Sequence, residues 1–411
     1  MVSPDHRPRP LPLLHAGRVA AAVLVAVLLA DRTRDLLIQA GLRWLHLLLL
    51  AAAAAYVATP VAYHLAHRLG ALDMPAGRKA HGEPTALLGG AAVYGAFALA
   101  VLRNFTFSVE LKGVALGASL VFAIGVLDDL WEVSARLRLA GQVVAVGILI
   151  HYGVAVSFLP ETWWGHAGEW LLTALWVIGI TNAVNFLDGM DGLAAGCSGI
   201  GAAFFGLVAL QNGQYYMLFL ALPLAGACAG FLVYNFRPGR RAHIFLGDGG
   251  STFLGFMMAS LAVMGDWASG SDSMVRLMVP VLILGVPIFD MTFTTIVRVA
   301  TGQVRTVRQW LEYTGRDHIH YQLEAMRTGR AGAVVIIYTL CLWLGLSALA
   351  LKNTTGINAL LQVAQSAIVF GLLAFFMLFV RRKYTEIEGD AVIAGLDPGD
   401  ELSGRTGRGR R

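Results

Sequence analysis

The chain has 411 residues, of which 57% are hydrophobic and only 14% are charged, and its formal net charge is +5. Soluble domains carry roughly 25% charged residues, so this composition excludes a soluble globular protein and indicates a multispanning membrane protein. The basic excess does not indicate nucleic-acid binding, because the basic residues lie in short loops between apolar runs, as membrane orientation requires.

The first apolar segment, residues 17–30, follows a basic lead that contains Arg7 and Arg9. This arrangement is typical of a signal sequence, but no convincing small-residue cleavage site follows before Asp31. We therefore predict an uncleaved extra helix within an N-terminal basic and apolar segment, residues 1–42.

Apolar runs long enough to cross a bilayer follow one another through residues 43–380, because about 20 residues of helix span ~30 Å of hydrocarbon. The predicted spans lie near residues 43–66, 88–103, 111–127, 139–158, 168–185, 193–211, 214–235, 251–265, 273–299, 332–352 and 358–380. We predict an all-α, polytopic integral membrane protein of about 11 transmembrane helices. The tail over residues 381–411 is polar and rich in Gly and Arg, which predicts disorder.

Basic residues are concentrated on one set of loops, which predicts the orientation of the chain. They are Arg68, Arg78, Lys79, Arg136, Arg138, Arg237, Arg240, Arg241, Arg305, Arg308, Arg316, Arg327 and Arg330, whereas the opposite loops hold little beyond Arg103, Lys112, Arg276 and Lys352. The first set is therefore predicted to be cytoplasmic. Arg32, Arg34 and Arg43 fall on the other side and go against this scheme.

Four acidic clusters lie at the ends of the apolar stretches, all on the predicted cytoplasmic side. They read GVLDDLWEVSARLRLAGQ, TNAVNFLDGMDGLAAG, HIFLGDGGSTFLGF and GVPIFDM, and begin at Gly125, Thr181, His243 and Gly285. An ionised Asp within hydrocarbon costs several kcal/mol, so each cluster needs a water-filled cavity, a cation or a polar partner. Their shared side predicts a polar reaction centre on a membrane scaffold.

Asp128 and Asp129 are adjacent carboxylates in the first cluster. Neighbouring anions raise each other's pKa unless a cation or a hydrogen-bond donor compensates. A solvated helix end would explain them equally well, but Arg136 and Arg138 follow within ten residues and offer phosphate-type donors.

Asn182, Asn185, Asp188 and Asp191 recur every three residues in the second cluster. Each such step turns about 60° around a helix, and the intervening glycines can break the helix to bring backbone close to a ligand. Carboxylate and amide oxygens are the hard ligands that Mg²⁺ accepts, usually with waters and substrate phosphates. Acids in the first turn of the next helix would be a purely structural explanation. The spacing favours the metal-binding interpretation.

Asp248 stands among three glycines in the third cluster, ahead of Ser251. A plain helix N-cap would account for this pattern. A tight loop whose amides and carboxylate hold a metal-bound diphosphate is favoured, because the preceding loop is basic.

Two further loops are predicted to bind anions. DMPAGRKAHGEPTALLGG carries Arg78 and His81 before a Pro and a Gly pair. GRDHIHYQL carries His318 and His320, whose spacing does not match a zinc site. Phosphate contact is therefore the favoured interpretation of both histidines.

The motifs RKAHGEPTALLGG, GVLDDLWEVSARLRLAGQ, NAVNFLDGMDGLAAG, FLGDGGSTFLG and DHIHYQL follow one another in this order. Together they resemble the polyprenyl-phosphate N-acetylhexosamine-1-phosphate transferases, a family of integral membrane enzymes, over the chain from Trp44 to Val380. The resemblance implies transfer of a sugar 1-phosphate from a UDP-sugar to an undecaprenyl-type phosphate, with release of UMP. It also implies dependence on Mg²⁺, for which Mn²⁺ is a candidate substitute.

The resemblance also assigns roles to residues. Asp128, Asp129, Asp188 and Asp191 are expected to be catalytic, and Asn185 and Asp248 to hold the metal. Those expected to bind substrate are Arg78, His81, Arg136, Asn182, Phe245, His318 and His320. Asp128 is expected either to remove a last proton from the lipid phosphate or to orient it. The chain departs from the family pattern at Tyr321, where a His is usual, and at His243, where a Lys is frequent.

Two alternatives stay open. Within the family, the phospho-N-acetylmuramoyl-pentapeptide branch usually has a fuller His-rich motif, so DHIHYQL favours an N-acetylglucosamine enzyme that starts a cell-wall or surface polysaccharide. An ion-coupled transporter would concentrate ionisable residues near the membrane centre, whereas these clusters lie at the ends of spans. The expected partners are a UDP-N-acetylhexosamine, polyprenyl phosphate and the cell membrane, with no nucleic acid and with a homodimer as a candidate assembly.

Overall fold

The computed structural model describes residues 15–393, apart from residues 75–83, 105–107, 269–272, 307–308, 311–312, 314 and 316. The described helices include α1 (His15–Leu29), α2 (Asp31–Gln39), α3 (Arg43–Leu69), α4 (Gly89–Asn104), α5 (Val109–Trp131), α6 (Ala135–His151), α7 (Trp163–Leu187), α8 (Leu193–Gln211), α9 (Tyr215–Asn235), α10 (Gly247–Met264), α11 (Ser273–Ile283), α12 (Gly285–Ala300), α14 (Ile319–Leu323), η1 (Glu324–Thr328), α15 (Gly329–Leu351) and α16 (Gly356–Ile393). Within these residues, one sheet pairs β1 (Leu72–Asp73) antiparallel with β2 (Thr85–Ala86).

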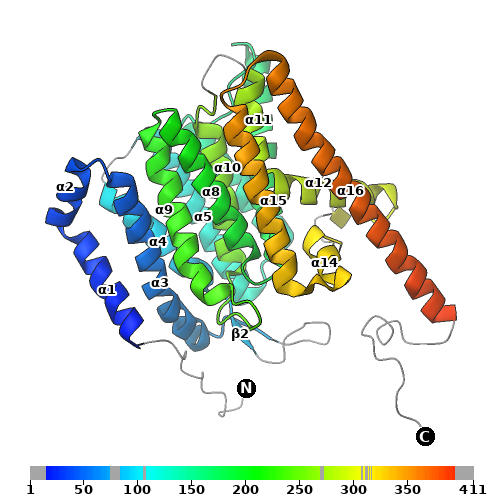
Figure 1. Cartoon of the computed structure of the whole chain (residues 1–411), viewed down its shortest axis with the longest axis horizontal. Helices are drawn as coiled ribbons and strands as arrows, with labels where there is room; N and C mark the ends of the chain where they lie inside the picture. Colours follow the sequence, from blue (N-terminus) through cyan, green and yellow to red (C-terminus); the bar gives the residue numbers. More distant parts are fainter. Residues whose placement is uncertain are drawn as a thin grey trace, which may run out of the picture.

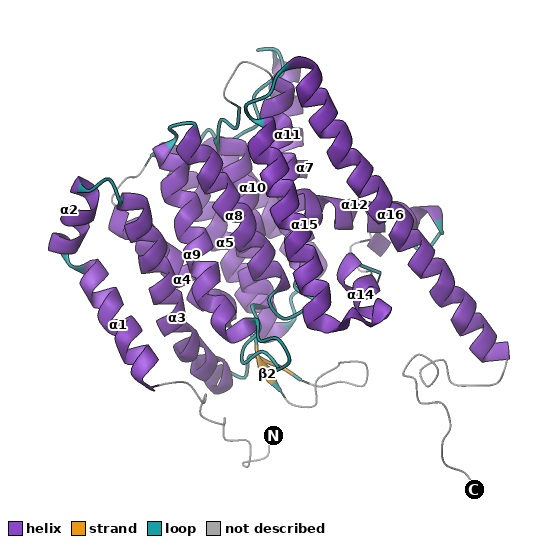
Figure 2. Cartoon of the chain, viewed as in Figure 1, coloured by secondary structure: helices purple, strands orange, loops and turns teal. Residues whose placement is uncertain are grey.

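The long helices stand side by side in a bundle, with the small sheet at one end (Figures 1 and 2). In the described part of the chain, seven helices are long and apolar enough to cross a membrane, or eight if the bent pair α11–α12 forms one span. Helices suit this environment because they satisfy their own backbone hydrogen bonds in lipid. The expected all-α, polytopic membrane fold is confirmed, and the full number of spans stays a prediction.

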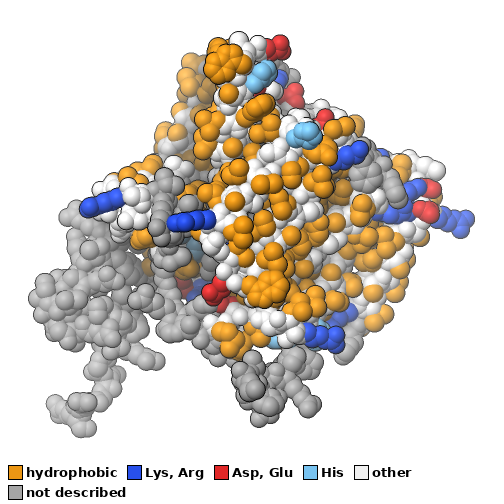
Figure 3. Space-filling view, turned by 180° about the vertical axis from the view of Figure 1, so that it is seen from behind, with side chains coloured by type: hydrophobic (Ala, Val, Ile, Leu, Met, Phe, Trp, Pro, Cys, Tyr) orange, Lys and Arg blue, Asp and Glu red, His pale blue; other side chains and the backbone are white. Residues whose placement is uncertain are grey.

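Hydrophobic side chains cover much of the face shown in Figure 3. The described residues also expose large side chains that a soluble protein would bury; Trp170 and Leu175 of α7, for example, are 54% and 62% exposed. Such a surface is suited to contact with lipid tails.

Helix α10 is central to the bundle and buried along most of its length. It packs against α4, α5, α7 and α8. Glycines permit this close packing: a Cβ on Gly255 would lie 2.7 Å from the Cα of Thr181 in α7, and one on Gly125 of α5 would lie 2.6 Å from the Cα of Gly249. Small residues of this kind let helix backbones approach in membranes. The acidic ends of α5, α7 and α10 are therefore held together.

The apolar segment predicted as a span over residues 273–299 is bent, because α11 and α12 meet at 83°. Pro287 lies in the first turn of α12 and has no backbone N–H to continue the hydrogen bonds of α11. Hydropathy does not reveal the bend, since both halves are apolar. Helix α12 consequently lies across the bundle (Figure 1).

Both ends of the described chain contain more helix than the sequence predicted. The apolar segment near residues 17–30 forms α1, which packs against α3, and a second short helix, α2, follows it. At the other end, α16 continues to Ile393, so residue 381 does not mark the end of helix as the predicted polar tail implied.

Candidate active site

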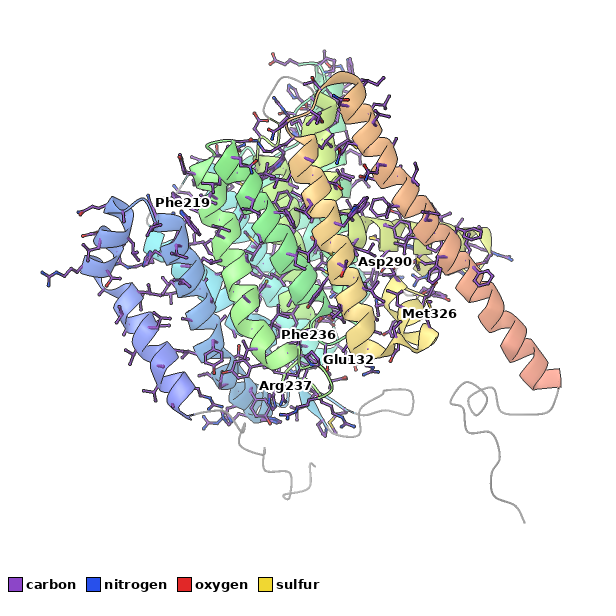
Figure 4. The ribbon with its side chains drawn as sticks, viewed as in Figure 1. Glu132, Phe219, Phe236, Arg237, Asp290 and Met326 are labelled. Carbon is purple, nitrogen blue, oxygen red and sulfur yellow. The ribbon has the colours of Figure 1, made fainter. Side chains whose placement is uncertain are left out.

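A cavity of about 940 Å³ opens at the sheet end of the bundle, where α5, α7 and α10 carry their acidic clusters. Figure 4 labels Glu132, one of its lining residues, at this end. Predicted site residues that line it are Asp128, Asp129, Asn185, Asp188, Asp191, Phe245 and Asp248. Three segments far apart in the sequence thus supply one site.

The adjacent carboxylates of α5 are compensated in different ways. Asp128 accepts hydrogen bonds from the backbone N–H of Val133 at 2.5 Å and from Nη1 of Arg138 at 2.6 Å. Asp129 accepts from the backbone N–H groups of Asp248 and Gly249, at 2.8 and 3.1 Å. Asp129 therefore caps the start of α10, where free amides and the helix dipole favour an anion. This pairing lets two neighbouring carboxylates coexist in a half-buried position.

Asp248 is the meeting point of the three helices. Its Oδ1 accepts from the side-chain amide of Asn185 at 2.7 Å, and Arg138 lies 3.4 Å from its Oδ2. Gly247 before it has φ of +77°, and a Cβ there would lie 2.2 Å from the carbonyl oxygen of Leu87. Only glycine adopts this conformation readily, so the preceding turn requires it. The turn aims Asp248 into the cavity.

The second cluster divides between the cavity and the protein interior. Helix α7 continues to Leu187, so Asn182 lies more than a turn inside it and pairs with Gln142 of α6, at 2.8 Å, instead of lining the cavity. Asp188 follows the helix end and Asp191 lies in the turn beyond, where its Oδ2 accepts from the backbone N–H of Ala242 at 3.0 Å. The predicted substrate contact of Asn182 is therefore not supported by its position.

Arg138, rather than Arg136, is the cation beside the carboxylates. Arg136 is exposed and is not among the residues that line the cavity. Two positions along a helix differ by about 200° in direction, so only one of them can face α10. The structure therefore places Arg138 beside the carboxylates, and substrate binding by Arg136 stays a prediction.

Negative charge is in excess around the cavity. Among its described lining residues the acids are Asp73, Asp128, Asp129, Glu132, Asp188, Asp191, Asp248 and Glu324, whereas the one Lys or Arg is Arg330. Arg330 itself donates to Glu324 at 3.0 Å. Burial, together with the carboxylates of Asp248, Asp129 and Asp191, raises the pKa of Asp188 well above its usual range. A bound cation would relieve this repulsion.

The donors around the cavity fit Mg²⁺ as an ion shared with substrate. Carboxylate and amide oxygens come from Asn185, Asp188, Asp191 and Asp248. No group of three His, Cys, Asp or Glu side chains within the described residues is already arranged to hold a metal. Mg²⁺ commonly uses one or two carboxylates and completes its shell with water and substrate phosphates. The donors are therefore suited to a Mg²⁺ ion that shares its ligands with substrate, rather than to an ion held by protein side chains alone.

The two histidines lie behind the cavity wall. His318 is bound through Nδ1 to Asp290 at 2.7 Å and its ring stacks on Phe186. His320 is fully buried, both of its ring nitrogens lack a hydrogen-bond partner, and burial lowers its pKa to about 4. A Cβ on Gly189 would lie 2.4 Å from His320 Nε2, so the ring abuts the backbone beside Asp188. Neither histidine is among the described residues that line the cavity, and their contact with phosphate stays a prediction.

The residue of this segment that lines the cavity is Tyr321, whose ring packs on His320 with centroids 4.1 Å apart. It occupies the position where the sequence departs from the related family. Asp290 accepts a hydrogen bond from the side chain of His318 and another, at 2.7 Å, from the backbone N–H of Ile319, and so fixes the start of α14. With α14 held in this way, Tyr321 faces the cavity.

Asp290 and Arg298 of α12 were not assigned roles from the sequence, although Asp290 is the acid of the fourth cluster. Arg298 makes two hydrogen bonds to Asp317, at 2.7 and 2.6 Å. With Asp290 and His318 these side chains form the histidine network, in which Asp290, Arg298 and His318 are buried and Asp317 is partly exposed. The sequence signal for Asp290 is its place in an apolar run close to Pro287, where an acid needs a buried partner.

Two predicted residues fall outside the described part of the chain. Arg78 and His81 belong to residues 75–83, which the structure does not describe. The residues before this segment, Asp73 and Met74, line the cavity. Phe245 lines it from the other side, and its backbone N–H donates to the carbonyl of Ala86 in β2 at 2.8 Å.

Comparison with known proteins identifies the family of this chain. Residues 111–266, which include the first three acidic clusters, match the model of glycosyl transferase family 4. A probable undecaprenyl-phosphate N-acetylglucosaminyl 1-phosphate transferase of Bacillus subtilis is 33% identical over 305 residues, which cover 73% of this chain and 82% of the relative. The chain belongs to glycosyl transferase family 4.

Other relatives in the family differ in how much of their length is matched. A decaprenyl-phosphate N-acetylglucosaminephosphotransferase of Mycolicibacterium smegmatis is 34% identical, over 79% of this chain and 84% of its own. A phospho-N-acetylmuramoyl-pentapeptide-transferase of Moorella thermoacetica is 41% identical, but over only 34% of this chain and 49% of its own. The long matches are thus to N-acetylglucosamine phosphotransferases.

Proposed function

We propose that the protein transfers N-acetylglucosamine 1-phosphate from UDP-N-acetylglucosamine to a polyprenyl phosphate, releasing UMP at the cytoplasmic face of the membrane. This reaction would be the first lipid-linked step of a cell-wall or surface polysaccharide. The observation that carries the proposal is the convergence of carboxylates from α5, α7 and α10 on one cavity, in a chain similar over most of its length to N-acetylglucosamine phosphotransferases.

The chemistry that this site must support is attack of one phosphate on another. A lipid phosphate has its second pKa near 6 and is mostly a dianion at pH 7, so it needs little activation. Its oxygen attacks the β-phosphorus of the UDP-sugar, and the bond from that phosphorus to the oxygen of UMP breaks. The main barrier is repulsion between the anions and the charge that develops on UMP.

Cations must therefore offset the negative charge of both the cavity and the substrates. When bound, Mg²⁺ supplies charge neutralisation for the diphosphate and the departing UMP. Asn185, Asp188, Asp191 and Asp248 are the residues that would hold it. In the absence of a cation, like charge in the cavity would repel both substrates.

The hydrogen bonds of Asp128 support an orienting role rather than proton removal. Both of its oxygens are engaged, one by the Val133 amide and the other by Arg138. Asp128 thereby holds the Arg138 guanidinium beside Asp248, where it can donate to a phosphate oxygen. Asp129 holds the start of α10 by accepting from the backbone N–H groups of Asp248 and Gly249.

An apolar groove between α7 and α12 offers a place for the polyprenyl chain. It has a volume of about 350 Å³ and is lined by Trp176, Ile180, Ala183 and Met291, among others. Ala183 lies five residues before Asp188 on the same helix, a rise of about 8 Å. A lipid chain in this groove would place its phosphate at the acidic cavity. The bend between α11 and α12 creates this surface.

The test is UMP release by purified full-length protein with undecaprenyl phosphate and Mg²⁺. UDP-N-acetylglucosamine, UDP-N-acetylgalactosamine and UDP-N-acetylmuramoyl-pentapeptide are supplied separately, and we expect UMP only with the first, dependent on the lipid. Release with the pentapeptide substrate alone would overturn the sugar assignment. Absence of UMP with every sugar, from protein that is folded and monodisperse, would overturn the reaction.

A further inference from the structure

A basic pocket lies at the end of the bundle opposite the acidic cavity. It has a volume of about 230 Å³, and its polar lining includes Arg34 of α2, Arg43 of α3 and Arg103 of α4. The Arg43 guanidinium lies 4.8 Å from the ring centroid of Phe219, which Figure 4 labels at this end. Helix α3 begins at Arg43 and, after 27 residues or about 40 Å, ends close to the acidic cavity.

The arginines of the pocket are held in place by protein groups. Arg43 donates to the side-chain and backbone oxygens of Asn104, at 2.8 and 2.7 Å. These contacts fix the guanidinium of Arg43 at the wall of the pocket.

Arg103 is the most buried of the three, with a side chain only 10% exposed. Its Nη2 donates to the carbonyl of Leu29 at 3.1 Å and to Asp31 at 2.6 Å, while its Nε is buried and has no hydrogen-bond partner. A buried donor without an acceptor is costly, so this N–H is positioned for a ligand oxygen.

The acids near the pocket do not fill it. Asp31 and Asp35, which pair with Arg103 and Arg34, have side chains 79% and 54% exposed, and neither lines the pocket. Both carboxylates are turned to solvent. The described lining of the pocket contains three arginines and no acid.

The surroundings of the pocket are suited to a lipid. Ile38 lines it, and the neighbouring side chains of Leu36 and Leu102 are 62% and 59% exposed. Apolar side chains in this exposed position border the hydrocarbon surface of a membrane protein. Basic pockets between membrane helices commonly bind anionic lipid head groups. Arginines on this side also go against the orientation rule, and a bound anion would compensate them.

We propose that this pocket binds the phosphate of an anionic phospholipid in the leaflet opposite the active site. Arg103 Nε and the guanidinium of Arg34 donate to phosphate oxygens, and the acyl chains lie along the apolar surface beside Ile38 and Leu102. Helix α2 is required, because it supplies Arg34. The lipid would fasten α1 and α2 to the ends of α3 and α4.

The test is native mass spectrometry of the delipidated full chain in detergent, titrated with phosphatidylglycerol or phosphatidylcholine. We expect phosphatidylglycerol to bind more tightly. Arg34→Gln and Arg103→Lys, the second of which keeps the charge but loses the Nε donor, should each weaken its binding about fivefold. Arg32→Gln is the matched control, since Arg32 is an exposed arginine of α2 outside the pocket, and should bind as the parent does.

The outcomes decide between a site and a general attraction. Equal binding of both lipids, unchanged binding by Arg34→Gln, or an equal loss in Arg32→Gln would overturn the proposal. Displacement of phosphatidylglycerol by inorganic phosphate at the same concentration would assign the pocket to a free anion and overturn the lipid. Arg34→Gln keeps the test valid if Arg103→Lys does not fold, because the acids that pair with Arg34, Asp31 and Asp35, are both exposed.

Discussion

The acidic cavity and the histidine network beside it use the same residue types for opposite purposes. In the network, Asp290 is matched by His318 and Asp317 by Arg298, at 2.6 to 2.7 Å. In the cavity, carboxylates outnumber cationic side chains among the described lining residues. Balanced charge holds α12 against α14, whereas excess charge is left for a ligand. The comparison distinguishes residues that maintain the fold from those that serve the reaction.

The largest expected effect comes from the cavity. Asp248→Asn removes the carboxylate at which the three helices meet and is expected to lower the rate of UMP release by about 10³-fold, because a preorganised charge is lost. Asp266→Asn is the control, since Asp266 is exposed, pairs with Arg276 at 3.1 Å and follows the end of α10 opposite to Asp248. Near-normal turnover by Asp248→Asn would remove this residue from the site.

Asp290→Asn tests the histidine network, where we expect loss of stability to be the main effect. It weakens a buried, charge-assisted pair and is expected to lower stability by about 2 kcal/mol, seen as a lower thermal midpoint. Activity of the protein that remains folded should fall about tenfold, because Tyr321 loses its support at the cavity wall. An unchanged midpoint would show that the network does not stabilise the fold.

Asp188→Asn should stabilise the protein while it inactivates it. Burial and the neighbouring carboxylates raise the pKa of Asp188 in the folded state above the ~3.9 of an unfolded chain. Folding thus favours the protonated form, and Asp188 destabilises the protein increasingly as pH rises above about 4. In EDTA, the variant is expected to have the higher thermal midpoint at pH 7, with the gain vanishing toward pH 4. A lower midpoint at pH 7 would contradict this balance.

Tyr321→His is expected to have the smallest effect. The imidazole can still pack on His320 and reach the cavity, and it restores the residue usual in the related family. We expect turnover within about threefold of the parent. Loss of activity without loss of thermal stability would mean that the Tyr321 hydroxyl has a specific part in the reaction.

The sequence was sufficient to predict the convergence of the acidic clusters. Asp128, Asp188 and Asp248 each follow or precede an apolar run on the same predicted side, and a bundle of parallel spans brings such ends together. The close contact depends on glycines such as Gly125 and Gly255, whose role becomes visible only when the neighbouring helix is known. Local pattern thus located the site.

What the sequence could not give is the rotation of helices and the direction of side chains. Arg136 and Arg138 are equivalent in composition, and only the packing of α6 against α5 selects Arg138. Asn182 fits the three-residue spacing, yet α7 continues past it and turns it toward Gln142. His318 and His320 face Asp290 and Gly189 because of long-range contacts with α12 and the end of α7. These features depend on tertiary structure.

The most direct test of a shared cation site is Mn²⁺ binding, measured by the electron paramagnetic resonance signal of free Mn²⁺ in the presence of UDP-N-acetylglucosamine. We expect one Mn²⁺ to bind to each parent chain and to each Asp266→Asn chain and to be displaced by excess Mg²⁺. We expect this binding to be lost in both Asp188→Asn and Asp248→Asn. Binding by these two variants equal to that of the parent would contradict the claim that the two segments hold one ion.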